Sequence, residues 1–328
     1  MMDAVNTRRR MLVALAGCVL TPSAAVAAAA FPTRTVRIVV PYSVGIGPDL
    51  VARALAERLA QRWGQPVIVD NKPGASGIVA FSEVRNTAPD GHTLFVGDTA
   101  TLAVNPLIHA SLPYDPARDL APISLLFRAT FLILVSSKNR YATVADLLAD
   151  ARQQPNKVSY ASLGNGHPTQ MAVETLARAA NVTMLHVPFK EAGALFTAVA
   201  LGDVDFTVFG LNSASGYLKG GKMKALAVAA PARLTEAPEI PTIVEVGGPA
   251  VEMRPWAALV GVAGTPSAVL ATIHREVIDA LAAPAVRGRI EAAGFEVTPS
   301  TPQQLTARID VDVKLYAALV REGRVRGD

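Results

Sequence analysis

TVRIVVPYSVGIGPDLVAR, residues 35–53, is the stretch that decides the fold of this chain. Its apolar start, residues 35–40, is rich in β-branched side chains and predicts a strand. Gly45 and Gly47 allow a tight turn, and Pro48 suits the first position of a helix. A strand, a turn and a helix in this order place a helix start beside the turn. Its backbone N–H groups and positive dipole end favour an anion without needing a lysine or arginine.

Strand and helix patterns alternate along the rest of the chain, which predicts the α/β class. The helix after the turn shows Val51, Leu55 and Leu59 at four-residue spacing, so it has one buried stripe. Thr143 and Thr301 each stand three residues before a side chain that can complete a helix cap, and we expect helices to begin there. Apolar runs predict further strands at 67–69, 93–96, 131–135, 157–160, 206–209 and 225–229.

The first thirty residues have the pattern of a secretory signal peptide. Three arginines at 8–10 precede an apolar stretch at 11–20, and the alanine-rich segment 24–30 offers several cleavage sites. The segment 15–18, LAGC, also resembles a lipoprotein box, so lipid anchoring at Cys18 stays an alternative. We expect export to the periplasm. Cys18 is the only cysteine, which excludes a disulfide within the folded body.

Composition bounds the function further. The chain has 328 residues, 51% of them hydrophobic, which is enough for about two domains with substantial cores. Its formal net charge of +4 falls by two when residues 1–30 are removed, because they hold three arginines and one aspartate. That balance argues against nucleic acid as a partner. No apolar run after the signal region approaches the ~20 residues that span a bilayer.

An exported dinucleotide-binding enzyme is the main rival interpretation of the first turn. Gly45-x-Gly47 follows a strand and opens a helix, and the next strand ends at Asp70, as in a dinucleotide fingerprint. The third glycine position, however, holds Leu50. No set of residues suits catalysis, and the five histidines show no spacing suited to a metal. We therefore predict no catalytic residue, metal site or cofactor, and keep the enzyme and a plain structural turn as alternatives.

A second stretch repeats the pattern of the first. Residues 159–170 read SYASLGNGHPTQ: a strand, a glycine turn and a helix that we expect to begin near Pro168. Two such helix starts on different domains, facing one cleft, could hold opposite sides of a small carboxylate.

Short proline- and glycine-rich segments follow one another in a fixed order: Phe31-Pro32, PYSVGIGPDLVAR (41–53), VDNKPGA (69–75), Pro89-Asp90-Gly91, LPYDP (112–116), Tyr160-Ala161-Ser162, HVPFK (186–190), PEIPT (238–242) and Gly264-Thr265-Pro266. In this order they resemble the extracytoplasmic solute receptors of tripartite tricarboxylate transporters, also called Bug-type receptors. The resemblance covers residues 31–328.

The resemblance implies a two-domain, type II periplasmic-binding-protein-like fold with a hinge and an interdomain cleft. Residues 31–127 with 252–328 would form domain 1, and 128–251 would form domain 2. A carboxylate would be held by backbone amides and ordered water rather than by an arginine. Matching positions imply these ligand-binding residues: Tyr42, Ser43, Val44, Gly45, Ile46, Gly47, Asp49, Asp98, Thr99, Ser162, Gly164, Asn165, Gly166, His167, Thr169, Phe189, Ala192, Phe209 and Gly210.

Departures from the family pattern bear on the ligand. Ile46 stands where a second adjacent glycine is usual, Glu191 where a glycine is usual after Lys190, and Asp98 where a small hydroxyl residue is common. Phe209-Gly210 replaces a polar pair. Asp98 would repel a second carboxylate, which favours a monocarboxylate or amino acid over a citrate-like ligand. For Asp49 we favour a structural role, in which it complements the helix start.

The implied function is capture of a small carboxylate, as a monomer, for the membrane subunits of a tripartite tricarboxylate-type transporter. A sensor that presents the ligand to a membrane signalling protein is the alternative that shares the same sequence features.

Overall fold

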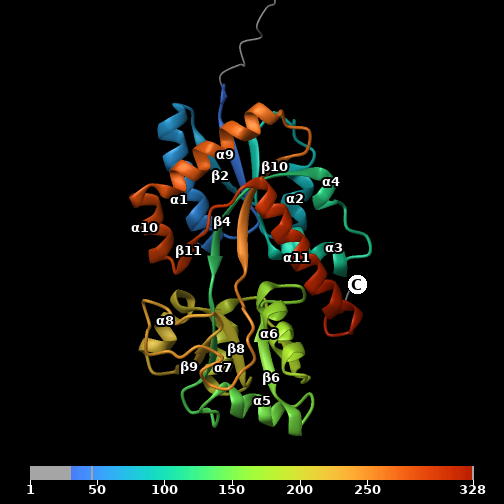
Figure 1. Cartoon of the computed structure of the whole chain (residues 1–328), viewed down its shortest axis with the longest axis vertical. Coiled ribbons are helices and arrows are strands. Elements are labelled where there is room, and N and C mark those ends of the chain that lie inside the picture. Colours follow the sequence, from blue (N-terminus) through green and yellow to red (C-terminus); the bar gives the residue numbers. More distant parts are fainter. Residues whose placement is uncertain (1–30, 46, 327–328) are drawn as a thin grey trace, which may run out of the picture. The chain divides into compact units, whose positions relative to one another are not determined.

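The computed structural model describes residues 31–45 and 47–326. Its strands form two sheets, one of six strands and one of five, which confirms the α/β class (Figure 1). Each sheet with its helices is here called a lobe. The signal peptide predicted for residues 1–30, the alternative lipid site at Cys18 and the predicted ligand residue Ile46 all lie outside the described residues.

The first lobe is built on the six-stranded sheet. Strands β1 and β3 are parallel, and β10 runs antiparallel to β3. Successive apolar side chains of β1 face opposite ways, so that Val40 packs with helices α1, α9 and α10 while Val39 packs with α2 and α11. In sheet order the strands are β11 (Phe295–Val297), β4 (Leu120–Ala129), β10 (Trp256–Val262), β3 (Thr93–Asp98), β1 (Val36–Val40) and β2 (Val67–Asn71).

The second lobe is built on the five-stranded sheet. Strands β6 and β8 are parallel, and β5 pairs with β8 in the opposite direction. Helices α5 and α6 cover one face of this sheet, and α7 and α8 cover the other. In sheet order the strands are β7 (Leu185–Pro188), β6 (Ser159–Ser162), β8 (Phe206–Gly210), β5 (Phe131–Ser136) and β9 (Met223–Val228).

The helices have the following bounds: α1 Gly47–Trp63, α2 Ile78–Val84, α3 Asn105–Ile108, α4 Pro116–Asp119, α5 Val144–Gln153, α6 Pro168–Ala179, α7 Ala192–Leu201, α8 Leu211–Lys219, α9 Ser267–Ala282, α10 Pro284–Ala292 and α11 Pro302–Arg321. The predicted caps at Thr143 and Thr301 are both present, each with its reciprocal partner. Helix α1 begins at Gly47, one residue before the predicted Pro48.

Two chain crossings connect the lobes. Strand β4 continues into β5 with only Thr130 between them, and the segment 229–255 returns from β9 to β10. The crossings bond to each other, because Ala129 N donates to Pro255 O at 2.8 Å and Phe131 N donates to Met253 O at 3.2 Å. The domain boundaries expected at 127/128 and 251/252 stay a prediction; the first of them lies inside β4.

A shared apolar cluster makes a third connection between the lobes. The second lobe contributes Met171 of α6, which is fully buried. The first lobe contributes Ile108 of α3 and Leu319 of α11 to the same cluster. The last described residues reinforce it: Arg324 Nη1 donates to Val182 O at 2.9 Å, and Asn165 Nδ2 donates to Arg326 O at 2.8 Å. We call this the α6–α11 contact.

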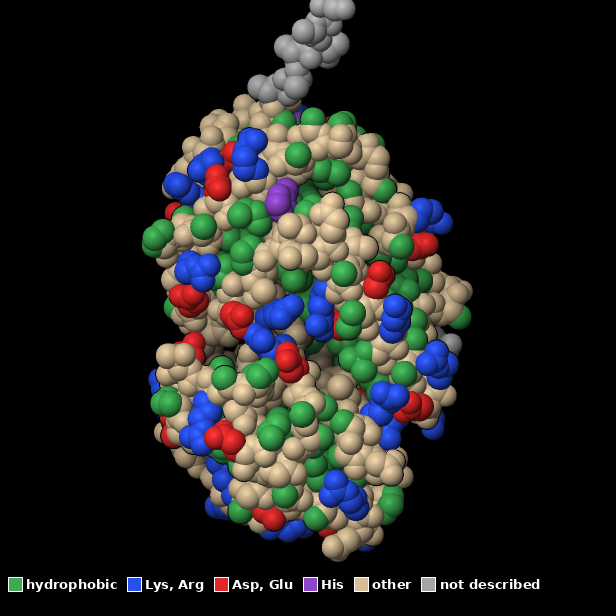
Figure 2. Space-filling model, viewed as in Figure 1, with side chains coloured by type: hydrophobic (Ala, Val, Ile, Leu, Met, Phe, Trp, Pro, Cys, Tyr) green, Lys and Arg blue, Asp and Glu red, His purple; other side chains and the backbone are tan. Residues whose placement is uncertain are grey.

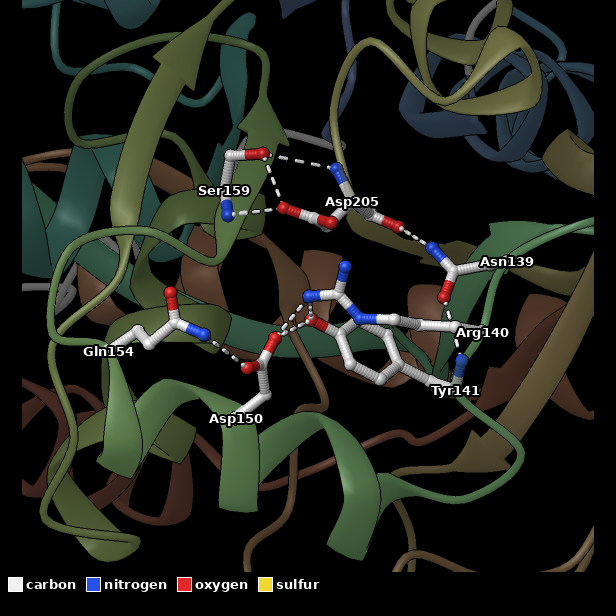
Figure 3. Close-up of polar contacts among 7 residues, drawn as sticks. All are labelled: Asn139, Arg140, Tyr141, Asp150, Gln154, Ser159 and Asp205. Carbon is white, nitrogen blue, oxygen red and sulfur yellow. Dashed lines mark hydrogen bonds and ion pairs between the residues drawn. The ribbon is translucent and has the colours of Figure 1, made fainter.

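A polar cluster fixes the far end of the second sheet (Figure 3). Asp205, just before β8, accepts hydrogen bonds from both the backbone N and the Oγ of Ser159 at 2.8 Å, which ties the start of β8 to the start of β6. Nearby, Tyr141 Oη donates to Asp150 Oδ2 at 2.5 Å, and Arg140 pairs with the same carboxylate. Because β6 and β8 begin here, this cluster lies opposite the loops that carry the predicted ligand residues.

Candidate functional site

The first predicted loop connects β1 to α1, and hydrogen bonds to the Asp49 side chain hold it in place. Gly45 has a left-handed φ of +84°, which glycine adopts without strain. Its N–H donates to Asp49 Oδ2 at 2.8 Å, while Arg53 Nε and Asn71 Nδ2 donate to the same carboxylate at 3.0 and 2.9 Å. The Asp49 side chain is only 1% exposed. Asp49 therefore holds the loop, and the N–H of Gly45 is already occupied.

The pKa of Asp49 reflects this arrangement. Burial by itself would raise the pKa, but the hydrogen bonds from Arg53, Gly45 and Asn71 outweigh it and hold the pKa below its usual value. The carboxylate is thus ionised at neutral pH. Asn71 also donates to Tyr42 O at 2.9 Å, so the same amide ties Asp49 to the start of the loop.

Half-buried Tyr42 and buried Asp98 form a pair at the ends of the neighbouring strands β1 and β3. The Tyr42 hydroxyl donates to Asp98 Oδ2, and Thr101 donates to Asp98 Oδ1 from both its N and its Oγ1 at 2.8 Å. Burial raises the pKa of Asp98, and these donors offset part of that rise. Every partner of this carboxylate is a donor, which is the pattern of an ionised group. Burial and the Asp98 charge also raise the pKa of Tyr42, which stays protonated.

Tyr42 and Asp98 line a small cavity of about 110 Å³ together with His167 of the second lobe. The opposite wall is the segment 74–77, in which all four residues have left-handed φ values from +45° to +136°. Such strain at two non-glycine positions, Ala75 and Ser76, is typical of a functional site. No ligand role was predicted for this segment, of which only Gly74 and Ala75 fall within the family segment 69–75; the glycines at its two ends were the available signal. Among the described residues that line the cavity, none is an arginine or a lysine.

The second predicted loop, residues 162–169, presents His167 to this cavity. His167 is the N-cap of α6: its Nδ1 accepts from Thr169 N at 3.2 Å, so the neutral ring carries its proton on Nε2. Burial lowers the pKa of His167 to about 4, which keeps the ring neutral at physiological pH. A neutral imidazole can still donate one N–H to a carboxylate.

His186 supports the same loop from behind. Its Nε2 lies 2.6 Å from Ser162 Oγ and its Nδ1 lies 3.2 Å from Gln170 Nε2, while Gln170 Oε1 accepts from Gly166 N at 2.7 Å. Burial lowers the pKa of His186. His186 therefore links the end of β6 to the start of α6. His186 lies in the family segment 186–190, but no role was predicted for it from the sequence.

The other predicted ligand residues are spread around this centre. Phe189, Ala192 and Phe209 pack against the apolar core below α7 and α8. Val44 is 69% exposed, whereas Thr99 and Thr169 are buried. The structure thus brings Tyr42, Asp98 and His167 to one cavity. The following predicted ligand residues do not line it: Ser43, Val44, Gly45, Gly47, Asp49, Thr99, Ser162, Gly164, Asn165, Gly166, Thr169, Phe189, Ala192, Phe209 and Gly210.

A larger cavity of about 820 Å³ lies between the lobes on the side of α8 and α10. Thr130, Leu211 and Arg254 line it, together with Phe295 and Glu296 at the start of β11. These elements lie on the left of Figure 1, and the face in Figure 2 is hollowed between its upper and lower parts, with acidic and basic side chains beside the hollow. On this side Asn212 Nδ2 of α8 donates to Ala292 O of α10 at 2.8 Å, which links the two lobes.

Residues 31–45 and 47–326 contain no cluster of three or more His, Cys, Asp or Glu side chains placed to hold a metal ion. No helix in this part of the chain combines the length and the apolar character that crossing a membrane requires.

Comparison with known proteins finds a matching family and relatives of similar length. The model of the tripartite tricarboxylate transporter family receptor matches residues 51–324. The UPF0065 protein in the tcbD-tcbE intergenic region of Pseudomonas sp. strain P51 is 31% identical over 99% of this chain and 98% of its own length.

Two solved structures are similar. Rpa4515 of R. palustris with adipate has a TM-score of 0.81 and 28% identity, covering 91% of this chain and 100% of that one. MatC of Rhodopseudomonas palustris with bound malate has a TM-score of 0.76 and 30% identity, covering 88% and 99%. The two-lobed architecture, the family match along most of the chain and the full-length relative agree: this protein belongs to the receptor family of tripartite tricarboxylate transporters.

Proposed function

We propose that the protein captures a small carboxylate between the first loop, 41–47, and the second loop, 162–169. The observation that carries the proposal is the cavity at which Tyr42 and Asp98 of one lobe meet His167 of the other. A ligand bound there touches both lobes, so it stabilises the form in which they are close together. The adipate and malate bound by Rpa4515 and MatC support a carboxylate as the ligand.

The charges around the cavity favour a ligand with one carboxylate. His167 can donate an N–H to that group, while the buried Asp98 carboxylate repels a second negative charge and attracts an ammonium or hydroxyl group. The described lining offers no cation to balance a di- or tricarboxylate. We therefore favour a monocarboxylate or an amino acid, in contrast to the dicarboxylates of the two similar structures.

We infer that the protein acts outside the cytoplasmic membrane, as a receptor rather than an enzyme, and delivers its ligand to the membrane subunits of a tripartite transporter. The signal-like pattern of residues 1–30 and the family membership support this. Presentation of the ligand to a membrane sensor is the second candidate. Genes for a large and a small membrane protein beside this one would favour transport, and an adjacent sensor gene would favour signalling.

Thermal unfolding with a ligand panel tests the proposal. The protein, purified without refolding, is heated with monocarboxylates, amino acids, malate, adipate, citrate and, as a control, NAD. A ligand at 100 times its Kd adds about 2.7 kcal/mol to the unfolding free energy. Shifts confined to monocarboxylates or amino acids support the proposal. Tight citrate binding with weak monocarboxylate binding contradicts the ligand class, and a shift with NAD alone favours the dinucleotide-binding enzyme.

A further inference from the structure

Phe295, the first residue of β11, stands directly against the first loop. A β-carbon built on Gly47 would lie 2.3 Å from Phe295 Cζ, closer than any real contact, so the ring occupies the space that a side chain at 47 would need. The ring also packs against Phe127 of β4, with centroids 4.5 Å apart. Gly47 is the first residue of α1, so Phe295 touches the helix start at which we propose the ligand binds.

The same ring borders the 820 Å³ cavity. Phe295 lines it with Leu211 of α8 and Arg254, and it packs against the apolar cores of both lobes. Gly47 itself does not line the cavity, so Phe295 is the residue that both touches the helix start and borders this space. Arg254 within that space pairs with Glu296, but its buried Nε has no hydrogen-bond acceptor among the described residues. Because that Nε is itself buried, an anion in the cavity would interact with the charge of Arg254 rather than with this donor.

We propose that Phe295 is a specificity-determining residue that limits ligand length, because its ring separates the first loop from the 820 Å³ cavity. This rests on the proposed binding of a carboxylate at the first loop. A ligand that extends from the loop toward α8 meets the ring. Without the ring, the chain of a longer ligand enters the cavity, and a second carboxylate at its far end reaches the neighbourhood of Arg254.

Calorimetric titration with straight-chain monocarboxylates from propionate to octanoate, and with dicarboxylates from succinate to suberate, tests this on the full chain. The variants are Phe295→Ala and the milder Phe295→Leu, which keeps the result readable if the first does not fold. Phe127→Leu is the matched control. It loses the same ring pair, but Phe127 does not line the cavity, and the three atoms nearest to a β-carbon at position 47 all belong to Phe295.

We expect the wild type to bind best at a short chain length, and Phe295→Ala to move the optimum to longer chains by two or more methylenes. Each newly accommodated methylene should raise affinity by about fourfold. Long dicarboxylates should gain more than monocarboxylates of equal length. Phe127→Leu should keep the wild-type order. An unchanged order of affinities in both Phe295 variants, or the same change in Phe127→Leu, overturns the role of Phe295 and leaves the proposed function standing. A wild type that binds no carboxylate overturns the proposed function and this inference together.

Discussion

Replacing Asp49 by Asn separates the structural role of this residue from direct ligand contact. The three hydrogen bonds to its carboxylate come from Gly45, Arg53 and Asn71, and the side chain is 1% exposed. An asparagine oxygen in the place of Oδ2 keeps the bonds from Gly45 and Arg53. Its NH₂ group then faces the NH₂ group of Asn71, so two donors meet where a donor met an acceptor.

The cost follows from these contacts. A buried donor left without an acceptor costs about 1–3 kcal/mol, and loss of the ion pair with the partly exposed Arg53 adds roughly 0.5–1 kcal/mol. We expect Asp49→Asn to lower the free energy of unfolding by about 2–3 kcal/mol, and the melting temperature by roughly 3–5 °C for a chain of this size. Ligand affinity should stay within about twofold of the wild type, because the bond to Gly45, and with it the loop, is kept.

The assay pairs urea unfolding with calorimetric titration of a ligand from the panel. Asp310→Asn, on the exposed side of α11, is the control for the same chemical change without buried partners. Since the pKa of Asp49 is held low, its contribution is present above about pH 4 and is lost as the pH falls further, so the two proteins should converge in acid. A variant as stable as the wild type, or one that folds normally but binds more than tenfold more weakly, refutes the structural assignment.

Three further predictions concern the same site. Tyr42→Phe removes one donor from the buried Asp98 carboxylate and should cost about 2 kcal/mol in urea unfolding; an unchanged midpoint contradicts the pairing. His167 has a pKa of about 4 when folded and about 6.5 when unfolded, so the unfolded state takes up the proton first as the pH falls from 7 to 5. The wild type should therefore lose stability over this pH range, and His167→Asn, which keeps the helix cap, should lose about 1 kcal/mol less. This figure is reduced because the His167 side chain is partly exposed. Equal losses in the two proteins would show that His167 titrates normally. Gly47→Ala should destabilise the protein by about 1–3 kcal/mol through its clash with Phe295, and the double variant with Phe295→Leu should recover part of this loss in a double-mutant cycle; strict additivity would argue against the contact.

Local patterns were enough to predict the class and many elements of this fold. The strand at 36–40, the glycine turn and the capping boxes at Thr143 and Thr301 depend on neighbours within a few residues, and all are present. Strands β4 and β10 were not among the strands predicted from apolar runs. β4 contains Pro122 and runs into β5 without a turn, so no turn residues mark its end. Its partner β10 lies more than a hundred residues away in the chain.

The candidate site also depends on contacts between residues far apart in the chain. Tyr42, Asp98 and His167 come from three separate segments, and only the family resemblance linked them in the sequence. The occupied N–H of Gly45 could not be predicted, because it depends on which way the Asp49 side chain turns. Phe295 carries no local signal at all. Its importance comes from the pairing of β11 with β4, which brings residue 295 beside residue 47.

The α6–α11 contact has a consequence for how the two halves can move. Two strands that cross side by side allow the lobes both to bend and to twist against each other. A third attachment away from them leaves mainly rotation about the line from the crossings to that attachment. Points near that line travel little. Gly166, which has no room for a β-carbon against Ile108, lies beside the third attachment, as does His167. Asn212 at the start of α8 lies on the other side, where its side chain donates to Ala292 of the first lobe. When the second lobe rotates against the first, His167 would therefore move little, whereas the end of β8 and helix α8 in the same lobe would move farther.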